Sequence, residues 1–444
     1  MSMAPSTNSD RRSTQERANP MNTTTEPKRW VASWTASLQG PYPMGNASAQ
    51  PDMQLAFPKP AQGACDQSFR LIVRPTLWGR AVRIRLSNAL GSKPVTFSDA
   101  HVGLHQASSA LVPGTNRPLK FSGANSITVA AGTWAWSDPV ELDFVADPDA
   151  IDLVGRKLAV SFYVVGQSGP MSWHAKALQT SYLTYPRAIS QAHAEHDAAF
   201  PLSANSWFFL DAVEMLMPAN AYTIVAFGDS ITDGSLSTLN GDDRWPDVLA
   251  RRLRALHGNR IGVVNAGIGG NQVVGPPTYS REKPFPGGPS ALMRLERDVL
   301  SLSGVGAVVW LEGINDFSTN GNASIEAVRD GLVDGVKRMR VKLPGVRVIG
   351  ATLVSALNAV QAHHGFKEED DKRRALNDFI RNSGTFDAVV DFDAVVTDPA
   401  TGEMRTPFVH NTTVGGPGDK LHPNRLGYLA MGMAFDLAAF RSPG

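Results

Sequence analysis

The sequence predicts a chain in two parts, an antiparallel β-sandwich followed by an α/β unit with a parallel sheet. From Trp30 to about Met217, short segments of alternating apolar and polar residues lie between turns. From Tyr222 onward, short apolar runs alternate with stretches of helical periodicity. The length of 444 residues also favours two domains, because it exceeds what one compact core usually serves.

The first part is expected to consist of half-buried antiparallel strands. In the segment 82–86, Val, Ile and Leu alternate with two arginines, which is the period of a strand with one buried face. Similar segments lie at 69–74 and 157–165, and turn signals rich in Gly and Pro separate them. Many short strands without a convincing amphipathic helix indicate a β-sandwich.

The second part is expected to be a parallel sheet with helices on both faces, because strand and helix signals alternate along the chain. The predicted strands are 223–227, 261–264, 307–311, 346–350 and 388–391, and the predicted helices are 245–256, 288–302, 325–342 and 372–382. The acidic run 368–371 is expected to be a solvated helix start. The predicted domains are a disordered tail at 1–29, a β-sandwich at 30–217 and an α/β domain at 218–444.

Composition excludes several classes of protein. There are 42 basic and 41 acidic residues, and no basic stripe that would indicate a nucleic-acid partner. No apolar run reaches the roughly 18 residues of a membrane span. A single cysteine, Cys65, and the absence of Cys/His spacings argue against a metal site, and no cofactor is expected. Residues 1–29 lack the apolar region of a signal peptide, which predicts a cytoplasmic location. Nothing in the sequence indicates an oligomeric state.

In a parallel sheet, chemistry gathers at the carboxyl ends of the strands. Ser230 follows the first apolar run and is expected in an exposed strand-to-helix turn. A helix N-cap is the structural alternative for such a serine. The G-x-S-x-G turn of α/β-hydrolases is not matched, because Thr232 stands where its second glycine belongs.

Two further strand ends carry groups that could stabilise an anion. The second run is followed by a glycine-rich stretch that includes Gly269 and Gly270. A dinucleotide-binding motif would need a third glycine where Gln272 stands, so backbone N–H donors to an oxyanion are the preferred interpretation. Asn315 follows the third run, and its amide could donate into the cleft or close an Asx turn.

Near the C-terminus, Asp419 and His422 stand three residues apart, on the same side of a predicted helical turn. A carboxylate at this spacing can orient an imidazole. Together with Ser230, these residues supply a nucleophile, a general base and the group that orients the base. The N–H groups of Ser230 and Gly270 and the Asn315 side chain supply three oxyanion donors.

On these residues the sequence resembles the GDSL or SGNH hydrolases. The matching blocks are 228–231, 265–270, 313–316 and 419–422, in order across residues 221–444. The resemblance implies a flavodoxin-like three-layer α/β/α fold and a serine esterase. It places the oxyanion glycine at Gly270, with Gly269 an adjacent possibility.

The first part resembles the β-sandwich that precedes this domain in a bacterial two-domain subgroup. The matching stretches are 30–34, 82–88 and 173–181. Members of that subgroup are often exported, in contrast to the cytoplasmic location predicted above. The residue His174 is expected to be packed at the domain interface, with a role in the cleft as the alternative.

The resemblance implies a small-molecule or carbohydrate ester as the substrate, with a short acyl group such as acetyl. Two alternatives stay open at this stage. A lysophospholipase or thioesterase of the same superfamily would need a long apolar groove. A non-catalytic carbohydrate-binding protein would use the β-sandwich and carry an inert hydrolase domain. The long polar stretch 355–371 is typical of a lid or specificity loop.

Overall fold

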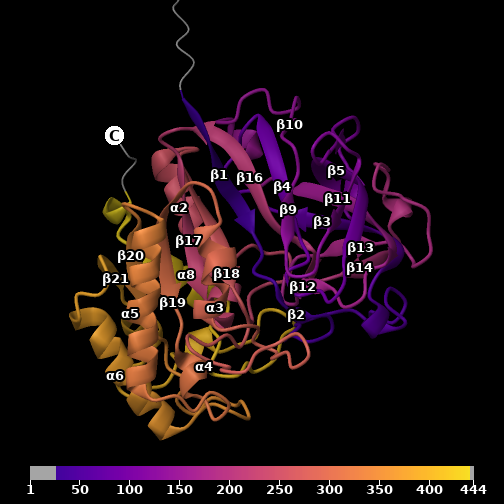
Figure 1. Ribbon diagram of the computed structural model, residues 1–444. Coiled ribbons are helices and arrows are strands. Elements are labelled where there is room, and N and C mark those ends of the chain that lie inside the picture. The colour runs from indigo at the N-terminus through magenta and orange to yellow at the C-terminus, as the bar shows by residue number, and fades with distance from the viewer. Residues whose placement is uncertain (1–26, 441–444) are drawn as a thin grey trace, which may run out of the picture.

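The computed structural model describes residues 27–440, and Figure 1 shows two parts side by side. The first part contains antiparallel sheets, and the second contains a five-stranded parallel sheet. The predicted α/β fold with a preceding β-sandwich is therefore confirmed. Residues 1–26 of the expected tail lie outside the described residues. The first strand begins at Lys28, slightly before the expected start at Trp30.

The strands of the first part form two larger sheets and a small one. Their orders are β1-β16-β4-β10 with β9 on β4, β14-β13-β3-β11-β5-β6 with β7 and β8 on β5, and β15-β12-β2. The strands are β1 (Lys28–Thr35), β2 (Gln39–Pro41), β3 (Cys65–Val73), β4 (Ala81–Ser87), β5 (Val95–Ala107), β6 (Ala110–Leu111), β7 (Arg117–Pro118), β8 (Ser126–Val129), β9 (Trp134–Trp136), β10 (Val140–Glu141), β11 (Leu158–Gln167), β12 (Ser172–His174), β13 (Ser181–Leu183), β14 (Leu202–Ala204), β15 (Trp207–Phe208) and β16 (Leu210–Pro218).

Apolar side chains of the two larger sheets share one buried core, which makes this part a sandwich. Ile84 and Met215 come from one sheet, and Phe69 and Phe162 come from the other, all fully buried. The rings of Phe69 and Phe162 are stacked with their centroids 5.3 Å apart. This packing explains the period of two in the sequence, since one face of each strand enters the shared core.

The opposite face of β4 is not a solvated face. Arg85 is only 1% exposed, and its Nε donates to Asp211 Oδ1 at 2.6 Å. Its Nη1 donates to Ser301 Oγ of the second part at 2.7 Å. The arginines of the alternating segment therefore face the second part of the chain, where paired polar groups replace solvent.

The second part has the strand order β18-β17-β19-β20-β21, and all pairs are parallel. In order of sequence this is the 2-1-3-4-5 arrangement of flavodoxin-like folds. The strands are β17 (Tyr222–Gly228), β18 (Ile261–Gly267), β19 (Val305–Leu311), β20 (Arg347–Ala351) and β21 (Ala388–Val390). The helices are α1 (Ser230–Asp233), α2 (Trp245–His257), α3 (Ala291–Leu295), α4 (Ile314–Phe317), α5 (Ile325–Lys342), α6 (Lys367–Asn382), α7 (Phe392–Val396) and α8 (Arg425–Met433).

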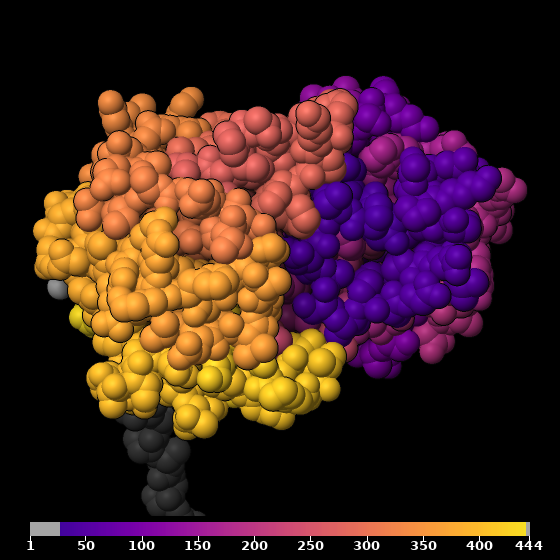
Figure 2. Space-filling view, turned by 90° about the horizontal axis from the view of Figure 1, so that it is seen from below, coloured from indigo at the N-terminus to yellow at the C-terminus, as the bar shows by residue number. Residues whose placement is uncertain are grey.

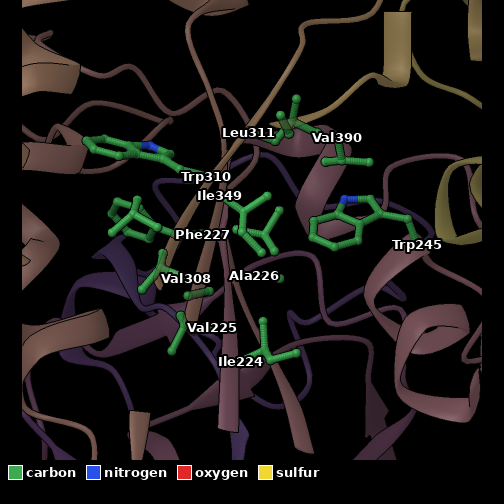
Figure 3. Packing of buried hydrophobic residues seen from close by; sticks show 14 of the residues in the cluster. Ile224, Val225, Ala226, Phe227, Trp245, Val308, Trp310, Leu311, Ile349 and Val390 are labelled. Atoms are coloured by element: carbon green, nitrogen blue, oxygen red, sulfur yellow. The ribbon is translucent and has the colours of Figure 1, made fainter. Parts of the chain in front are cut away.

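Helices cover both faces of the parallel sheet. On one face, α5 contacts α3 and α6, and on the other α8 contacts α2 and α7. Figure 3 shows Phe227 and Trp310 together on one side of the strands and Trp245 on the other side. Trp245 packs on Phe392 of α7, with ring centroids 5.4 Å apart. Both faces of the sheet are therefore buried, as the continuous apolar runs predicted.

Two helices differ from their predicted forms. The expected helix 288–302 is a short α3 continued by a π-helical turn (Glu296–Leu300). The acidic run 368–371 does start a helix, and Glu368 and Asp371 are exposed as expected, but the expectation of a solvated face is wrong for Glu369 and Asp370. Asp370 is 4% exposed and pairs with the buried Arg373, with Nε and Oδ1 2.7 Å apart. Sequence composition cannot distinguish such a buried pair from a surface run of the same charges.

The two parts meet along a seam that Figure 2 shows between the indigo and the orange-to-yellow atoms. Strand β1 packs beside β18 at the edge of the parallel sheet. Ala32 N donates to Ser303 O at 2.9 Å, and Thr35 Oγ1 donates to Asn265 O at 3.0 Å. Within residues 27–440, none of the helices combines the length and apolarity needed to span a membrane.

Candidate active site

Ser230 lies at the carboxyl end of β17, as the first residue of α1. Asp229 caps this helix, and its Oδ1 accepts a hydrogen bond from Ile231 N at 2.9 Å. Gly228 permits a close approach to the neighbouring strand, because a Cβ there would lie 2.2 Å from Leu311 O. The N-cap alternative for Ser230 is therefore wrong, since Asp229 holds that position. Ser230 is 5% exposed and lines a cavity.

His422 connects Ser230 to Asp419. Its Nε2 lies 2.8 Å from Ser230 Oγ, and its Nδ1 lies 2.6 Å from Asp419 Oδ2. The segment is not the expected helical turn. It precedes α8 as an irregular turn in which Asp419 Oδ1 accepts from the N–H groups of Leu421 and His422, at 3.0 and 2.9 Å. The spacing of three thus works through an Asx-type turn rather than through a helix face.

These contacts fix the hydrogen-bonding role of each ring nitrogen. An ionised carboxylate only accepts, so Nδ1 donates to Asp419 and Nε2 is left to accept the Ser230 hydroxyl. Burial raises the pKa of Asp419, but the charge and hydrogen bond of His422 and the backbone N–H groups outweigh burial and hold it well below its ordinary value. Asp419 is therefore ionised across the pH range in which enzymes are normally assayed.

Gly270 and Gly269 differ in what their N–H groups reach. The Gly269 N–H donates to Asp233 Oδ2 at 3.0 Å. Among the described residues, the Gly270 N–H has no acceptor, and Gly270 lines the same cavity as Ser230. Gly270 has a φ of +82°, and a Cβ there would approach Asn46 Nδ2 to 2.9 Å. The geometry thus favours Gly270 over Gly269 as a donor into the cavity.

Asn315 lies in α4 beyond the end of β19 and borders the cavity. Its Nδ2 donates to Asn271 O at 2.9 Å, so the side chain bonds to the glycine-rich loop and does not close an Asx turn on its own backbone. An amide nitrogen carries two hydrogens, and one is left for an acceptor in the cavity. Asn315 is only 7% exposed, so its side chain is largely shielded from solvent.

The cavity beside Ser230 has a volume of about 460 Å³ and a mainly polar lining. The lining residues are Asn46, Lys176, Ser230, Gly270, Gln272, Phe285, Pro286, Gly287, Asn315, Ser318, Asn320, Gln361, Ala362, His363, His364, Leu421 and His422. The expected loop 355–371 reaches this wall, but its last part is helical because α6 begins at Lys367. Within the described part of the chain, no cluster of three or more His, Cys, Asp or Glu side chains could hold a metal ion.

Sequence reasoning missed Arg294, which joins the first two strand ends. It is fully buried in α3, and its Nη2 donates to Gly228 O at 2.7 Å. Its Nη1 donates to Ala266 O at 2.7 Å, and its Nε donates to Asn271 Oδ1 at 2.7 Å. One guanidinium thus holds the Ser230 turn and the glycine-rich loop together. An arginine within a helical pattern gave no signal of this role.

Two more residues of the site carried no sequence signal. Gln361 Nε2 donates to Asp419 Oδ2 at 2.8 Å, so the long loop after β20 supports the carboxylate. Lys176 comes from the first part of the chain and lines the same cavity as Ser230. Both depend on contacts between segments far apart in the sequence.

His174 lies at the interface, as expected, and supports the glycine-rich loop indirectly. Its Nδ1 lies 2.8 Å from Ser37 O, and its Nε2 lies 3.1 Å from Asp233 Oδ1. Ser37 O and Asp233 Oδ1 can both accept hydrogen bonds, and the ring lies between them. Asp233 in turn accepts from Gly269 N–H. The first part of the chain is thereby connected to the loop that holds Gly270.

Replacing His174 with alanine is expected to lower the free energy of unfolding by about 3–5 kcal/mol, because it leaves the buried Asp233 carboxylate without its side-chain partner on the sandwich. Chemical denaturation at neutral pH measures this loss. His193→Ala, at an exposed site in the same part of the chain, is the control and should change stability little. An equal effect of the two variants would contradict the interface role of His174.

The same pair predicts a pH dependence. Burial raises the pKa of Asp233, but His174 and Lys176 outweigh burial and hold it below its ordinary value. A lowered carboxyl pKa adds stability above the unfolded pKa of about 3.9, and that stability is lost as the pH falls further. The stability difference between wild type and His174→Ala should therefore shrink below about pH 4.

Comparisons with known proteins agree with this architecture. A family model described as the GDSL-like lipase/acylhydrolase family matches residues 226–430. No curated protein matches the chain.

Solved structures similar to the chain include Est24, a carbohydrate acetylesterase from Sinorhizobium meliloti, at 15% identity and a TM-score of 0.37. That alignment covers 50% of this chain and 100% of Est24. A lipase/acylhydrolase from Enterococcus faecalis has 22% identity and a TM-score of 0.37 over 50% of this chain and 99% of its own. An aryl esterase from M. smegmatis has 18% identity and a TM-score of 0.36 over 48% and 96%. On the family match, residues 226–430 of this chain form a GDSL-like lipase/acylhydrolase domain, the domain of a carboxylic ester hydrolase.

Proposed function

We propose that this protein is a serine esterase that hydrolyses short-chain carboxylic esters through an acyl-enzyme intermediate. The observation that carries the proposal is the continuous hydrogen-bonded row from Ser230 Oγ through His422 to Asp419. It supplies a nucleophile, a base and an orienting carboxylate with the distances that proton transfer needs.

In this mechanism, Ser230 Oγ attacks the ester carbonyl while His422 Nε2 takes its proton. Asp419 holds the ring in the required tautomer and stabilises the imidazolium that forms. His422 then protonates the departing alkoxide, and the acyl group remains on Ser230. A water molecule, deprotonated by His422, attacks the acyl-enzyme. The bond between the acyl carbon and Ser230 Oγ then breaks, His422 returns the proton to Oγ, and the carboxylic acid is released.

The negative charge that develops on the carbonyl oxygen needs donors that are already in place. Three groups are proposed for this role, the N–H groups of Ser230 and Gly270 and the free amide hydrogen of Asn315. The Ser230 N–H lies at the first position of α1, where no intrahelical acceptor exists. Donors fixed by the fold stabilise the oxyanion without reorganising during the reaction.

The polar cavity supports a short acyl group over the lipid-directed alternative. Amide side chains from Asn46, Gln272 and Gln361 line it, whereas a long alkyl chain would require a continuous apolar groove. An ester of a small molecule or of an acetylated carbohydrate suits such walls. The inert-domain alternative is disfavoured because the full row of Ser230, His422 and Asp419 is hydrogen-bonded.

A series of 4-nitrophenyl esters from acetate to dodecanoate tests the substrate class. We expect kcat/KM to be highest for the shortest acyl groups and to fall by about tenfold or more toward dodecanoate. The polar cavity offers no apolar groove in which a long alkyl chain could be buried. Acetylated sugars measured in parallel test the alcohol side. A maximum at the long-chain esters would instead support a lysophospholipase or thioesterase, and no hydrolysis of any ester would support the non-catalytic alternative.

The variant Asn315→Ala tests the oxyanion assignment. Loss of one donor should lower kcat by roughly 10²–10³-fold, while KM changes little because the ground-state carbonyl carries less charge. The variant also loses the hydrogen bond to Asn271 O, so its unfolding free energy should fall by about 1 kcal/mol. Kinetics and thermal melting on one sample separate the two effects.

A matched control for this variant is Asn382→Ala, at an exposed position near the end of α6. It should leave both kcat and melting temperature close to wild type. A near-normal kcat for Asn315→Ala together with a lowered melting temperature would remove Asn315 from the mechanism.

A further inference from the structure

Lys176 is a buried lysine that reaches the cavity from the opposite part of the chain. It lies between β12 and β13 of the sandwich and is 6% exposed. The backbone on either side of it is fixed, because Ala175 N donates to Gln39 Oε1 at 3.3 Å and Ala177 N donates to Asn205 O at 3.1 Å. The side chain is therefore presented to the site by a rigid segment.

The ammonium group lies beside the glycine-rich loop. Its Nζ donates to Ser235 Oγ at 2.6 Å, and a Cβ on Gly269 would lie only 3.1 Å from it. Lys176 lines the same cavity as Ser230, Gly270 and His422. A group that occupied this cavity could therefore contact both Lys176 and the reacting serine.

The hydrogen-bonding capacity of this ammonium is incompletely used. An ammonium has three N–H donors, and Ser235 accepts one of them. Burial lowers the pKa of Lys176, and the nearby charges of Asp233 and Asp419 only partly oppose this effect. Within residues 27–440, no carboxylate lies in ion-pair contact with Lys176. A buried cation without a contacting anion is unfavourable, and an arriving anion would relieve this with charge-assisted hydrogen bonds.

The composition of the cavity points to the same kind of ligand. None of its lining residues is acidic, and Lys176 is the only lysine or arginine among those lining residues. The amides of Asn46 and Gln272 line the same cavity. A neutral or cationic substrate would leave the ammonium unpaired, whereas a carboxylate would pair with it.

We propose that Lys176 is a specificity-determining residue that binds a carboxylate carried by the ester substrate. This proposal rests on the proposed esterase function. It implies that the preferred substrate is an ester that bears a carboxylate, on either the acyl or the alcohol side, close to the bond that is cleaved. It also means that the β-sandwich supplies part of the substrate site.

The test compares each anionic ester with its neutral methyl ester. The alcohol-side pair is 4-acetoxybenzoate and methyl 4-acetoxybenzoate, and the acyl-side pair is mono-4-nitrophenyl succinate and 4-nitrophenyl methyl succinate. For at least one pair, Lys176→Met should lower the anionic-to-neutral ratio of kcat/KM by roughly 10- to 100-fold relative to wild type, as expected for a hydrogen bond to a charged group. Intrinsic reactivity cancels because the same esters are used with each variant.

Two further variants keep the test decisive. Lys120→Met removes an exposed lysine of the same sandwich and should leave the ratio unchanged. Lys176→Gln retains a hydrogen-bond donor without the charge, and it should lose the preference as Lys176→Met does. Thermal melting identifies a variant that fails to fold, in which case the Lys176→Gln result decides. An equal loss for both members of each pair, or an unchanged ratio, would overturn the proposal.

Calorimetric binding of succinate and 4-hydroxybenzoate separates this proposal from the esterase proposal. Wild type should bind at least one of these carboxylates roughly tenfold or more tightly than Lys176→Met does. Equal binding by the two proteins would contradict the carboxylate site. Carboxylate binding that depends on Lys176, in a protein that cleaves no ester, would overturn the esterase function and leave the binding site standing.

Discussion

Replacing Ser230 with alanine is expected to lower kcat for 4-nitrophenyl acetate by about 10⁶-fold, the size of effect seen when a triad nucleophile is removed. The change deletes only Oγ, whose sole hydrogen-bond partner among the described residues is His422 Nε2. The turn itself is held by Asp229 Oδ1 and by Gly228, which the substitution leaves in place. The variant should therefore fold and melt close to wild type.

Steady-state kinetics with a highly purified sample measure this loss, because trace wild-type enzyme would mask a large effect. Ser383→Ala, at an exposed position after α6, is the matched control and should retain full activity. A Ser230→Ala protein that keeps more than about 1% of wild-type kcat would contradict the nucleophile assignment.

Replacing His422 with alanine is expected to lower kcat by a similar factor of about 10⁶, because the serine hydroxyl then has no base. The contact of Nε2 with Ser230 Oγ at 2.8 Å makes His422 the only base in hydrogen-bond reach among the described residues. Groups that act as one unit are not additive, so the double variant of Ser230 and His422 should be no slower than either single one.

The exposed His410, a short distance upstream, offers a matched control for this experiment. His410→Ala should retain nearly all of the wild-type kcat. If the losses from Ser230→Ala and His422→Ala multiplied in the double variant, the two residues would be acting independently, in conflict with the proposed mechanism.

Much of the α/β part could be predicted because its signals are local. The apolar run 223–227 lies inside β17, and the helical stretch 325–342 coincides with α5. Buried parallel strands need continuous apolar residues, and helices need apolar residues that recur with the helical period. Both patterns can be recognised within a short stretch of sequence. Ser230, Gly270, Asn315, Asp419 and His422 were predicted as site residues in the same way, since each follows a predicted strand or precedes a predicted helix.

What the sequence did not reveal depends on partners far away in the chain. Arg85 and Arg294 have the sequence signal of ordinary polar positions, but Arg85 donates to Asp211 and Ser301, 126 and 216 residues away, and Arg294 donates to Gly228, 66 residues away. The burial of Asp370 with Arg373 could not be distinguished from a surface pair, because the charges are the same in both cases. Lys176 could not be recognised from the sequence, since its position in the cavity depends on the packing of the sandwich against the second part of the chain.

The central claim is that Ser230 carries the acyl group, and covalent labelling tests it most directly. The full-length protein would be treated with a fluorophosphonate probe, digested and mapped by mass spectrometry. The account predicts a single adduct on Ser230, and no adduct in the Ser230→Ala protein or after His422 is replaced. An adduct on a different serine, or labelling of Ser230→Ala at the wild-type rate, would contradict it.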